Sequence, residues 1–488
     1  MLACESEEYI PDEAGEGIVG AGGTYVATFS SPMILPEGVG GMATITFTYA
    51  RPWETGEEPA DTRVLEVWVT EAGGLIIPEE EGDGFDVKTA VLERFLGYVV
   101  HDTQSALDSD TVPSTGKQIE FAKLLAEECE RMGLGEVVLS DFGVVMATLP
   151  SNMNAKVPVM GLLAHMDTSP DAPGEGVVPR IFENYDGGDI VLSAETVISP
   201  REFPALANYA GQTIITASGN TLLGADDKAG IAEILTAMEY LLQHPEIPHG
   251  KIRVAFTPDE EIGLGTENFD VAAFGADFAF TVDGGATGEL EYENFNAASA
   301  TFEITGKSIH TGYAKGIMIN SLLIAAELAM AFPPDETPSA TEGYEGFYHL
   351  AGIEGDVGYT KMYLLIRSFD KEEFEARKKF AADLADSVNE KYGANTVKLE
   401  ISDQYYDMKE KIDPWIIEYA KSAYAGAGVE PIIIPVRGGT DGAMLSYKGL
   451  PCPNIFAGEH NFHGMYEFVP LESMEKAVHV IINLCKAE

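Results

Sequence analysis

The sequence contains few positive charges. Its 488 residues include 30 lysines and arginines against 79 aspartates and glutamates, for a formal net charge of −49 at pH 7. Self-repulsion of this size would be screened in a salty cytoplasm. The same charge argues against nucleic acid or an anionic membrane as a partner. We therefore expect an acidic, solvated surface and no nucleic-acid-binding function.

Cysteines and long apolar runs are also scarce. The four cysteines, Cys4, Cys129, Cys452 and Cys485, are scattered and form no Cys-x-x-Cys pair. This excludes a zinc finger and fits a reducing compartment. No apolar run reaches the roughly 18 residues of a membrane helix. With 45% hydrophobic residues, the chain is expected to be a multidomain, cytoplasmic, globular protein without a membrane partner.

The amino-terminal segment differs from the rest of the chain. Residues 1–73 contain short strand-like stretches between glycine turns, and residues 74–86 form an acidic linker. The loops GAGG at 20–23, GVGG at 38–41 and RPW at 51–53 resemble the second half of chagasin-like cysteine-peptidase inhibitors, which are small immunoglobulin-like sandwiches. The NPTTG loop of that family has no counterpart, so we expect a partial β-sandwich. A gene-fusion remnant, a working inhibitor and a docking module remain alternatives, and a cysteine peptidase is not expected as a partner.

From Val87 onward the pattern is that of an α/β protein. Amphipathic helices alternate with short apolar strands in residues 87–296 and 408–488, which are expected to form one domain in two parts. Residues 297–407 follow the order β-α-β-β-α-β of the ferredoxin-like arrangement. The sequence therefore predicts an α+β lid domain inserted into an α/β domain.

Acids and a histidine follow three apolar strands of the first part. His165 and Asp167 come after VPVMGLLA, Glu260 and Glu261 after KIRVAFT, and Asp283 after DFAFTV. In an open α/β sheet, ligands bind outside the carboxyl ends of the strands. Acids and imidazoles repeated at that edge predict a metal site with more than one metal.

Two further fragments extend this set. Asp226 and Asp227 lie where an apolar stretch gives way to a helix, a place where acids are also common as simple helix caps. His463 follows the apolar NIFA in the glycine-flanked sequence GEHNFHG. A carboxylate has two oxygens and can bridge two cations, which is the alternative to a capping role for Asp226.

Neighbouring residues can divide the chemistry between them. Of the adjacent Glu260 and Glu261, one can bind a metal while the other holds a proton from metal-bound water. Asp167 can accept the second ring N–H of His165, as metal-bound histidines almost always require. Together the fragments provide the residues of a hydrolytic site with two metals about 3.5–4 Å apart. Nitrogen and oxygen ligands without sulfur suit zinc, with cobalt or manganese as alternatives.

Residues 87–488 resemble the peptidase T family of tripeptide aminopeptidases, in the dinuclear-zinc aminoacylase and carboxypeptidase clan. The motifs that carry the resemblance include AHMDTSPD, TLLGADDKAGIAEI, IRVAFTPDEEIG, TVDGG, RGGTDGA and GLPCPNIFAGEHNFHG. The resemblance implies a zinc-exopeptidase fold, a mixed sheet flanked by helices with the inserted lid. It also implies that short peptides, above all tripeptides, lose their N-terminal residue. ENFNAAS and EGYEGFYHLAG lie outside the metal fragments and favour this activity over a dipeptidase, carboxypeptidase or deacylase of the same clan.

The family pattern implies two zinc ions, each held by one histidine and two carboxylates, with one aspartate shared. The implied ligands are His165, Asp226 and Asp283 for one zinc and Asp226, Glu261 and His463 for the other. Glu260 is implied as the general acid and base, and Asp167 as the residue that orients His165.

The resemblance also implies residues that contact the substrate. Arg367 in LLIRSFD and Arg437 in PVRGGTDG match positions expected to bind the peptide carboxylate, a task that suits the planar guanidinium. A structural ion pair is the alternative for each arginine. His310 lies where related enzymes bring a histidine to the reacting carbonyl, although their His-Pro-Gly is His-Thr-Gly here, and Asn320 follows in the same turn. A homodimer formed through the lid domain is compatible with this interpretation.

Overall fold

The structure is a computed structural model that describes residues 85–487 in full and, before them, the backbone of short strands. Residues 1–86 and 87–488 form two compact units. The strands of the first unit are β1 (Ala3–Pro11), β2 (Gly23–Ser30), β3 (Gly41–Tyr49), β4 (Asp61–Val69) and β5 (Leu75–Ile76). β1 pairs antiparallel with β2, and β4 pairs antiparallel with β3 and β5. Short strands are what the sequence predicts here, whereas the RPW loop and most of the GAGG and GVGG loops lie outside the described residues.

A mixed sheet forms the centre of the second unit. In the described residues its strand order is β20-β15-β21-β14-β8-β13-β7-β6. The strands are β6 (Gly135–Leu139), β7 (Val145–Leu149), β8 (Met160–His165), β13 (Ile252–Thr257), β14 (Phe278–Gly284), β15 (Glu289–Glu291), β20 (Ile432–Ile433) and β21 (Asn454–Phe456). β21, β14, β8 and β13 run parallel, and β7 and β15 pair antiparallel with this group. The parallel strands are almost wholly buried, as strands covered on both faces must be.

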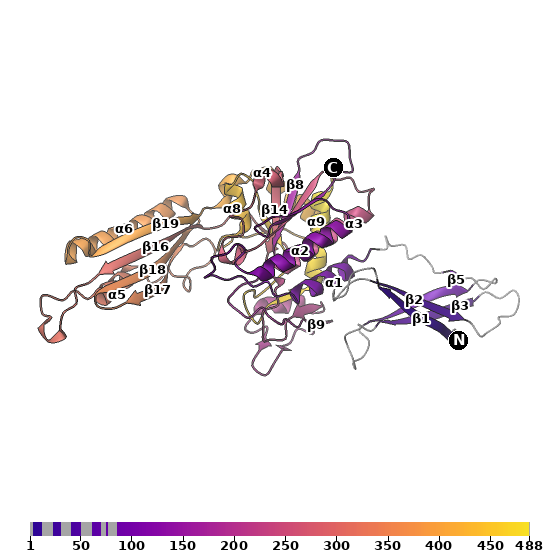
Figure 1. The fold of residues 1–488 in the computed structure, drawn as a ribbon, viewed down its shortest axis with the longest axis horizontal. Coiled ribbons are helices and arrows are strands. Elements are labelled where there is room, and N and C mark those ends of the chain that lie inside the picture. The colour runs from indigo at the N-terminus through magenta and orange to yellow at the C-terminus, as the bar shows by residue number, and fades with distance from the viewer. Residues whose placement is uncertain are drawn as a thin grey trace. The chain divides into compact units, whose positions relative to one another are not determined.

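Helices cover the mixed sheet (Figure 1). α3 (Ala225–Gln243) packs on β8 and β14 and is flanked by α1 (Val87–Val99) and α9 (Leu471–Cys485). α2 (Gly116–Met132) packs on β6 and β7, α7 (Pro414–Gly426) packs on α9, and α8 (Asp441–Tyr447) contacts β14. This arrangement confirms the predicted α/β class. No helix in the described part of the chain has the length and apolar character needed to cross a bilayer.

Shorter elements extend the edges of this unit. β12 (Ile214–Thr216) pairs antiparallel with β9 (Arg180–Phe182) and β22 (Phe468–Pro470), and β10 (Ile190–Val191) pairs with β11 (Val197–Ile198). The remaining short helices are η1 (Pro204–Tyr209), η2 (Glu260–Ile262), α4 (Val271–Phe274), η3 (Thr311–Tyr313) and η4 (Met408–Lys411). η2 concerns the site directly, because it follows the end of β13.

A second, antiparallel sheet follows the predicted β-α-β-β-α-β order. Its elements are β16 (Asn296–Thr305), α5 (Ser321–Ala331), β17 (Phe347–Gly355), β18 (Tyr359–Ser368), α6 (Lys371–Tyr392) and β19 (Val397–Tyr405), with the spatial order β17-β18-β16-β19. Alternate residues of β16 and β18, such as Phe302 and Leu364, share one apolar core with Leu328 of α5 and Phe374 of α6. Both helices therefore cover the same face of this sheet (Figure 1), as in the ferredoxin-like arrangement.

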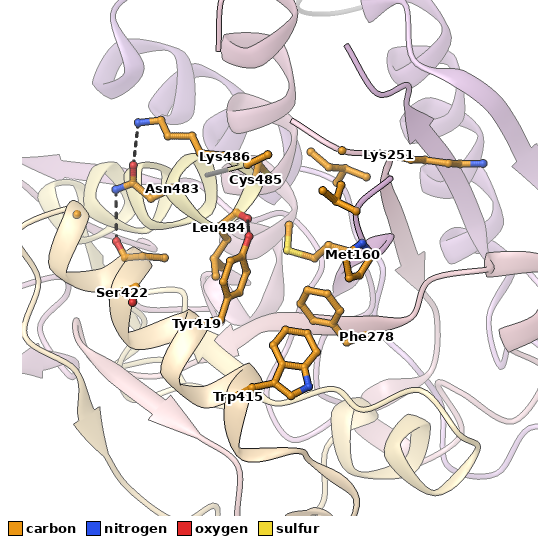
Figure 2. A pocket seen from close by; sticks show the side chains of 17 residues that line it. Met160, Lys251, Phe278, Trp415, Tyr419, Ser422, Asn483, Leu484, Cys485 and Lys486 are labelled. Atoms are coloured by element: carbon orange, nitrogen blue, oxygen red, sulfur yellow. Dashed lines mark hydrogen bonds between the residues drawn. The ribbon is translucent and has the colours of Figure 1, made fainter. Parts of the chain in front are cut away.

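The two ends of the central parallel strands differ in chemistry. At their amino ends, a cavity of about 540 Å³ is lined by Met160, Ile252 and Phe278, the first residues of β8, β13 and β14. Figure 2 shows Trp415 and Tyr419 of α7 beside Phe278, and the Phe278 and Trp415 rings meet edge to face with centroids 4.9 Å apart. The carboxyl ends of the same strands carry the histidine and the acids instead.

Gly230 brings α3 into backbone contact with β14. A Cβ atom there would lie 1.9 Å from the carbonyl oxygen of Val282 and 2.4 Å from Oδ1 of Asp227, so no side chain fits. The N–H of Gly230 donates to Oδ1 of Asp227 at 3.1 Å, and the N–H of His165 donates to Oδ2 at 3.0 Å. The Asp227 carboxylate therefore joins the start of α3 to the end of β8.

Gly230→Ala is expected to lower the free energy of unfolding by about 1–3 kcal/mol, the usual cost of overpacking a core. Urea unfolding followed by circular dichroism measures this loss. Gly97→Ala is the matched control, because Gly97 also lies in a helix and a Cβ atom there meets nothing within 4 Å. The control should keep or slightly raise stability, since alanine favours helix over glycine by about 1 kcal/mol. Equal stability of Gly230→Ala and the wild type would contradict the close contact.

Candidate metal centre

The candidate site lies at the carboxyl ends of the central strands. β8 ends at His165, its neighbour β13 ends at Thr257, and β14 on the other side carries Asp283 just before its last residue. His165 is level with Thr257, and Leu163 is level with Thr281. Because the three strands are parallel, their carboxyl ends meet at one edge of the sheet. The sheet thereby brings His165 and Asp283 together.

Asp226 lies between two histidines that are far apart in the sequence. Nε2 of His165 is 2.7 Å from Oδ1 of Asp226, and Nε2 of His463 is 3.0 Å from Oδ2. Each histidine has a second carboxylate beside it. Nε2 of His165 is 3.6 Å from Oδ1 of Asp283, and Nε2 of His463 is 2.8 Å from Oε2 of Glu261. The five predicted ligands therefore form two groups that share Asp226.

His463 reaches the site from a hairpin closed by His460 and Phe468, whose backbone N–H and C=O groups exchange two hydrogen bonds of 3.0 Å. His463 has a φ of 63°, in the left-handed region that non-glycine residues rarely adopt. His460 lies elsewhere: its Nε2 is 2.7 Å from the Tyr209 hydroxyl, and its ring stacks on Phe468. Burial lowers the pKa of His460 to about 4. Of the two histidines in GEHNFHG, His463 is the one that joins the centre.

Asp167 contacts both His165 and the segment after β13. One of its oxygens is 3.3 Å from Nδ1 of His165, although not at a hydrogen-bonding angle. The same carboxylate accepts the backbone N–H of Glu260 at 3.0 Å and that of Glu261 at 3.2 Å. These glutamates open η2, so Asp167 holds the start of η2 next to His165.

Asp259, which the sequence reasoning missed, fixes the turn before Glu260. It has a φ of 57°, and its carboxylate accepts the Ser114 N–H at 2.7 Å and a Gln118 side-chain N–H at 2.7 Å. The side-chain oxygen of Gln118 accepts the Asp259 N–H at 3.0 Å in return. This buried network ties the two glutamates of η2 to the start of α2.

Glu467 connects the Asp226 turn to the His463 hairpin and was also missed. The side chain is 2% exposed. Its Oε2 accepts the backbone N–H of Leu223 at 2.6 Å and that of Gly224 at 2.8 Å, and its Oε1 accepts that of Asp226 at 3.1 Å. The start of a helix leaves N–H groups without helical partners, and Glu467 accepts that of Asp226 in the first turn of α3 as well as two from the residues just before it. The only feature of the sequence that could have indicated Glu467 is that it is an acid close to His463, a predicted ligand.

Burial opposes the ionised form of the site carboxylates. It raises the pKa of Asp283, raises that of Glu260 well above its usual range, and raises that of Glu261 to about 8. Burial acts on Asp226 in the same direction, but hydrogen bonds from its two histidines outweigh it and hold the pKa below the ordinary value. Within residues 85–487, no lysine or arginine forms an ion pair with these carboxylates. Their ionised forms need positive charge from elsewhere.

The chemistry of these donors fits divalent cations. Ligand atoms of His165, Asp226 and Glu261 all lie within 4.8 Å of one another, as do those of His165, Asp227 and Asp283. The groups are imidazole nitrogens and carboxylate oxygens without sulfur, which suit transition-metal ions such as zinc, cobalt and manganese. A shared aspartate with a histidine on each side is an arrangement that could hold two such ions.

The two predicted substrate arginines have different surroundings. Arg437 donates to the carbonyls of Gly343 at 2.6 Å and Glu345 at 3.1 Å, and its guanidinium lies over the Phe295 and Phe347 rings. Arg367 donates through Nη1 to two carbonyls and lies over the Tyr405 ring, 5.4 Å from its centroid. Neither arginine has an acidic partner among the described residues. The ion-pair alternative therefore receives no support.

His310 and Asn320 make local contacts. Nδ1 of His310 accepts the N–H of Gly312 at 3.2 Å. Oδ1 of Asn320 accepts the N–H of Leu322 at 3.0 Å, so Asn320 caps the start of α5. The structure thus brings the predicted ligands together with Glu260 and Asp167. It gives His310 and Asn320 contacts within their own turns.

Comparisons with known proteins show the family to which this chain belongs. Residues 221–487 match the model of peptidase family M20/M25/M40. Peptidase T of Geobacillus thermodenitrificans is 56% identical over 404 residues, which cover 82% of this chain and 98% of that protein. The chain belongs to the peptidase T family. Peptidase T of Desulfitobacterium hafniense is 55% identical over 400 residues, which cover 81% of this chain and 97% of that protein.

Solved structures share the peptidase T fold. Aminopeptidase PepT from Bacillus cereus matches with a TM-score of 0.65 at 23% identity, covering 82% of this chain and 98% of that chain. A dinuclear metal binding peptidase of family M20 from Bacillus subtilis matches with a TM-score of 0.56 at 14% identity, covering 82% and 97%. Residues 1–67 match the chagasin family of peptidase inhibitors, I42. Both resemblances predicted from the sequence are confirmed.

Glu467→Gln is expected to lower metal affinity and activity by about 10–100-fold, the usual effect of removing a residue that orients a ligand. The amide that replaces one oxygen is a donor and cannot accept a backbone N–H. Metal content after dialysis against a weak chelator, together with kcat on a tripeptide, measures the effect. Glu183→Gln, which changes an exposed glutamate, is the control. Full metal retention in Glu467→Gln would show that Asp226 keeps its place without Glu467.

Proposed function

We propose that this chain is a metal-dependent aminopeptidase that removes the N-terminal residue from tripeptides. The observation that carries the proposal is the position of Asp226 between His165 and His463, with a further carboxylate beside each histidine. Membership of the peptidase T family supports the substrate class. The short peptide is the expected partner.

We assign the ligands as the two groups around Asp226. One cation is assigned to His165, Asp226 and Asp283, and the other to Asp226, Glu261 and His463. Zinc is our choice for both ions, because two imidazoles and three carboxylates without sulfur suit it, with cobalt and manganese as alternatives. When bound, such a pair polarises the scissile carbonyl and makes water nucleophilic near neutral pH.

Glu260 is our candidate for the residue that moves the proton. Its carboxylate would take a proton from the attacking water and return it to the amine nitrogen that leaves. The hydrogen bonds from the Glu260 and Glu261 N–H groups to Asp167 support this division, because they fix two adjacent carboxylates at one place. Asp167 would in addition keep the ring of His165 in one orientation.

On the substrate side, we propose that Arg367 binds the C-terminal carboxylate of the peptide. Its guanidinium donates to two carbonyls through Nη1 and lies beside Tyr405, and it has no acidic partner among the described residues, so its charge can meet an incoming carboxylate. The four hydrogen bonds of Arg437 to residues 341–345 use both of its terminal nitrogens. We therefore infer that Arg437 acts on substrate by ordering this loop. His310 and Asn320 remain candidates for substrate contact on the family pattern.

We also propose a functional division of the chain. Residues 297–407 would act as a lid on a catalytic domain made of 87–296 and 408–488. Residues 1–73, with the linker 74–86, would form a separate amino-terminal segment. A cysteine peptidase is not its expected partner.

The surface of α5 supports a homodimer formed through the lid. Leu322, Leu323 and Met330 are 39%, 68% and 84% exposed on this helix, and exposed apolar clusters commonly mark protein interfaces. A cytoplasmic location is our choice of compartment, because the thiols of Cys129 and Cys452 are buried and unpaired, as in reducing compartments.

The direct test of the function is hydrolysis by the zinc-loaded full-length protein at low and high salt. The substrates are a tripeptide, its N-acetylated form, its C-terminal amide and the corresponding dipeptide, with products identified by mass spectrometry. We expect release of the N-terminal residue from the free tripeptide, and weaker activity on the amide because it lacks the carboxylate. Cleavage of the acetylated peptide, or release of the C-terminal residue, would place the protein in another branch of the clan.

Glu260→Ala is expected to reduce kcat by about 10²–10⁴-fold, the range for loss of a general acid and base. Because Glu260 is not among the assigned ligands, the variant should keep the metal content of the wild type. Single-turnover kinetics and elemental analysis of the same sample give both quantities. Joint loss of metal and activity would contradict the proton-transfer role.

A further inference from the structure

We propose that Glu459 is a further ligand of the metal centre, on the side of His165 and Asp283. The inference rests on the dinuclear centre proposed above and adds a residue that the family pattern does not assign. Glu459 is the glutamate of GEHNFHG, and it has no role in the sequence analysis or in the proposed mechanism.

The backbone brings Glu459 past the site aspartate of β14. β21 runs parallel to β14, and two hydrogen bonds continue this pairing beyond the end of β21. The N–H of Ala457 donates to the carbonyl of Gly284 at 2.7 Å, and the N–H of Gly458 donates to that of Gly285 at 2.8 Å. Glu459 is the next residue, so its position is fixed by the same sheet edge that carries the site.

The Glu459 side chain is buried and lies within the cluster of acids. It is 2% exposed, and its Oε2 has no hydrogen-bond partner in the described part of the chain. Ligand atoms of Asp226, Asp283 and Glu459 all lie within 4.8 Å of one another. Asp226 and Asp283 are the two carboxylates assigned to the cation of His165. The Glu459 carboxylate is therefore a third carboxylate at the position assigned to this cation.

A buried carboxylate without a partner requires a proton or a cation. An unpaired charge in such a position is strongly unfavourable. A divalent cation held by Asp226 and Asp283 would supply the positive charge and a bond for the free oxygen.

The assignment makes the two halves of the centre unequal. The half with His165 would have one imidazole and three carboxylates, and the half with His463 one imidazole and two carboxylates. Because carboxylate oxygens suit manganese whereas imidazole suits zinc, we expect the half with His165 to bind Mn²⁺ more tightly than the other half.

The test is Mn²⁺ binding to the metal-free, full-length protein, with free Mn²⁺ measured by electron paramagnetic resonance. The wild type should bind two ions, one more tightly than the other. Glu459→Gln keeps the size of the side chain and an acceptor oxygen but removes the charge, so it mimics a protonated glutamate. We expect this variant to weaken the tighter site by at least about tenfold and to leave the other unchanged.

Glu291→Gln is the matched control, because Glu291 is 8% exposed, accepts a hydrogen bond from Asn454 at 3.1 Å and lies outside the cluster. It should bind Mn²⁺ as the wild type does. Glu459→Asp retains the charge and should keep more affinity than Glu459→Gln. Thermal melting of each variant confirms that it is folded.

Two results would overturn the inference. Unchanged affinities at both sites of Glu459→Gln would show that Glu459 is a protonated neighbour of the centre, while the proposed function stood. Binding of fewer than two ions by the wild type would overturn this inference together with the dinuclear centre, so the two failures are distinguishable.

Discussion

The contact of one carboxylate with two imidazoles is the constraint on which this site depends. Asp226 places its two oxygens 2.7 Å and 3.0 Å from Nε2 atoms of His165 and His463. The first histidine ends a central strand, the aspartate opens a buried helix, and the second histidine lies near the end of the chain. The mixed sheet, the packing of α3 and the hairpin of His463 must all form before the three groups can meet.

Backbone N–H groups hold the acids of this centre in place. Asp167 accepts from the two glutamates of η2, Asp227 accepts from His165, and Glu467 accepts from the turn before α3. Hydrogen bonds from neutral N–H groups satisfy these carboxylate oxygens, whereas the buried ammonium of Lys228 donates to the carbonyl of His101. This leaves the net negative charge that metal ions can balance, which connects the fold to the proposed chemistry.

Local patterns made much of the fold predictable. Amphipathic periodicity indicated helices that alternate with strands in residues 87–296 and 408–488, and α2 (Gly116–Met132) and α9 (Leu471–Cys485) are two of them. The β-α-β-β-α-β order gave the second sheet. The placing of acids after apolar strands indicated the site edge, because parallel strands bring their carboxyl ends together.

Other features depend on contacts that no local pattern contains. Glu467 contacts residues more than 240 positions away, and Glu459 meets Asp226 and Asp283 only in the folded chain. Similarly, His460 and His463 share one short motif, and the Tyr209 hydroxyl decides that His460 is directed away from the centre. Arg437 donates to three carbonyls and a hydroxyl of residues 341–345, contacts that its own motif does not contain.

The most direct test of this account is anomalous diffraction from crystals of the zinc-loaded protein. The account predicts two anomalous peaks about 3.5–4 Å apart, with an oxygen of Asp226 bound to each and one histidine on each side. A single peak, or two peaks that do not share Asp226, would contradict the central claim.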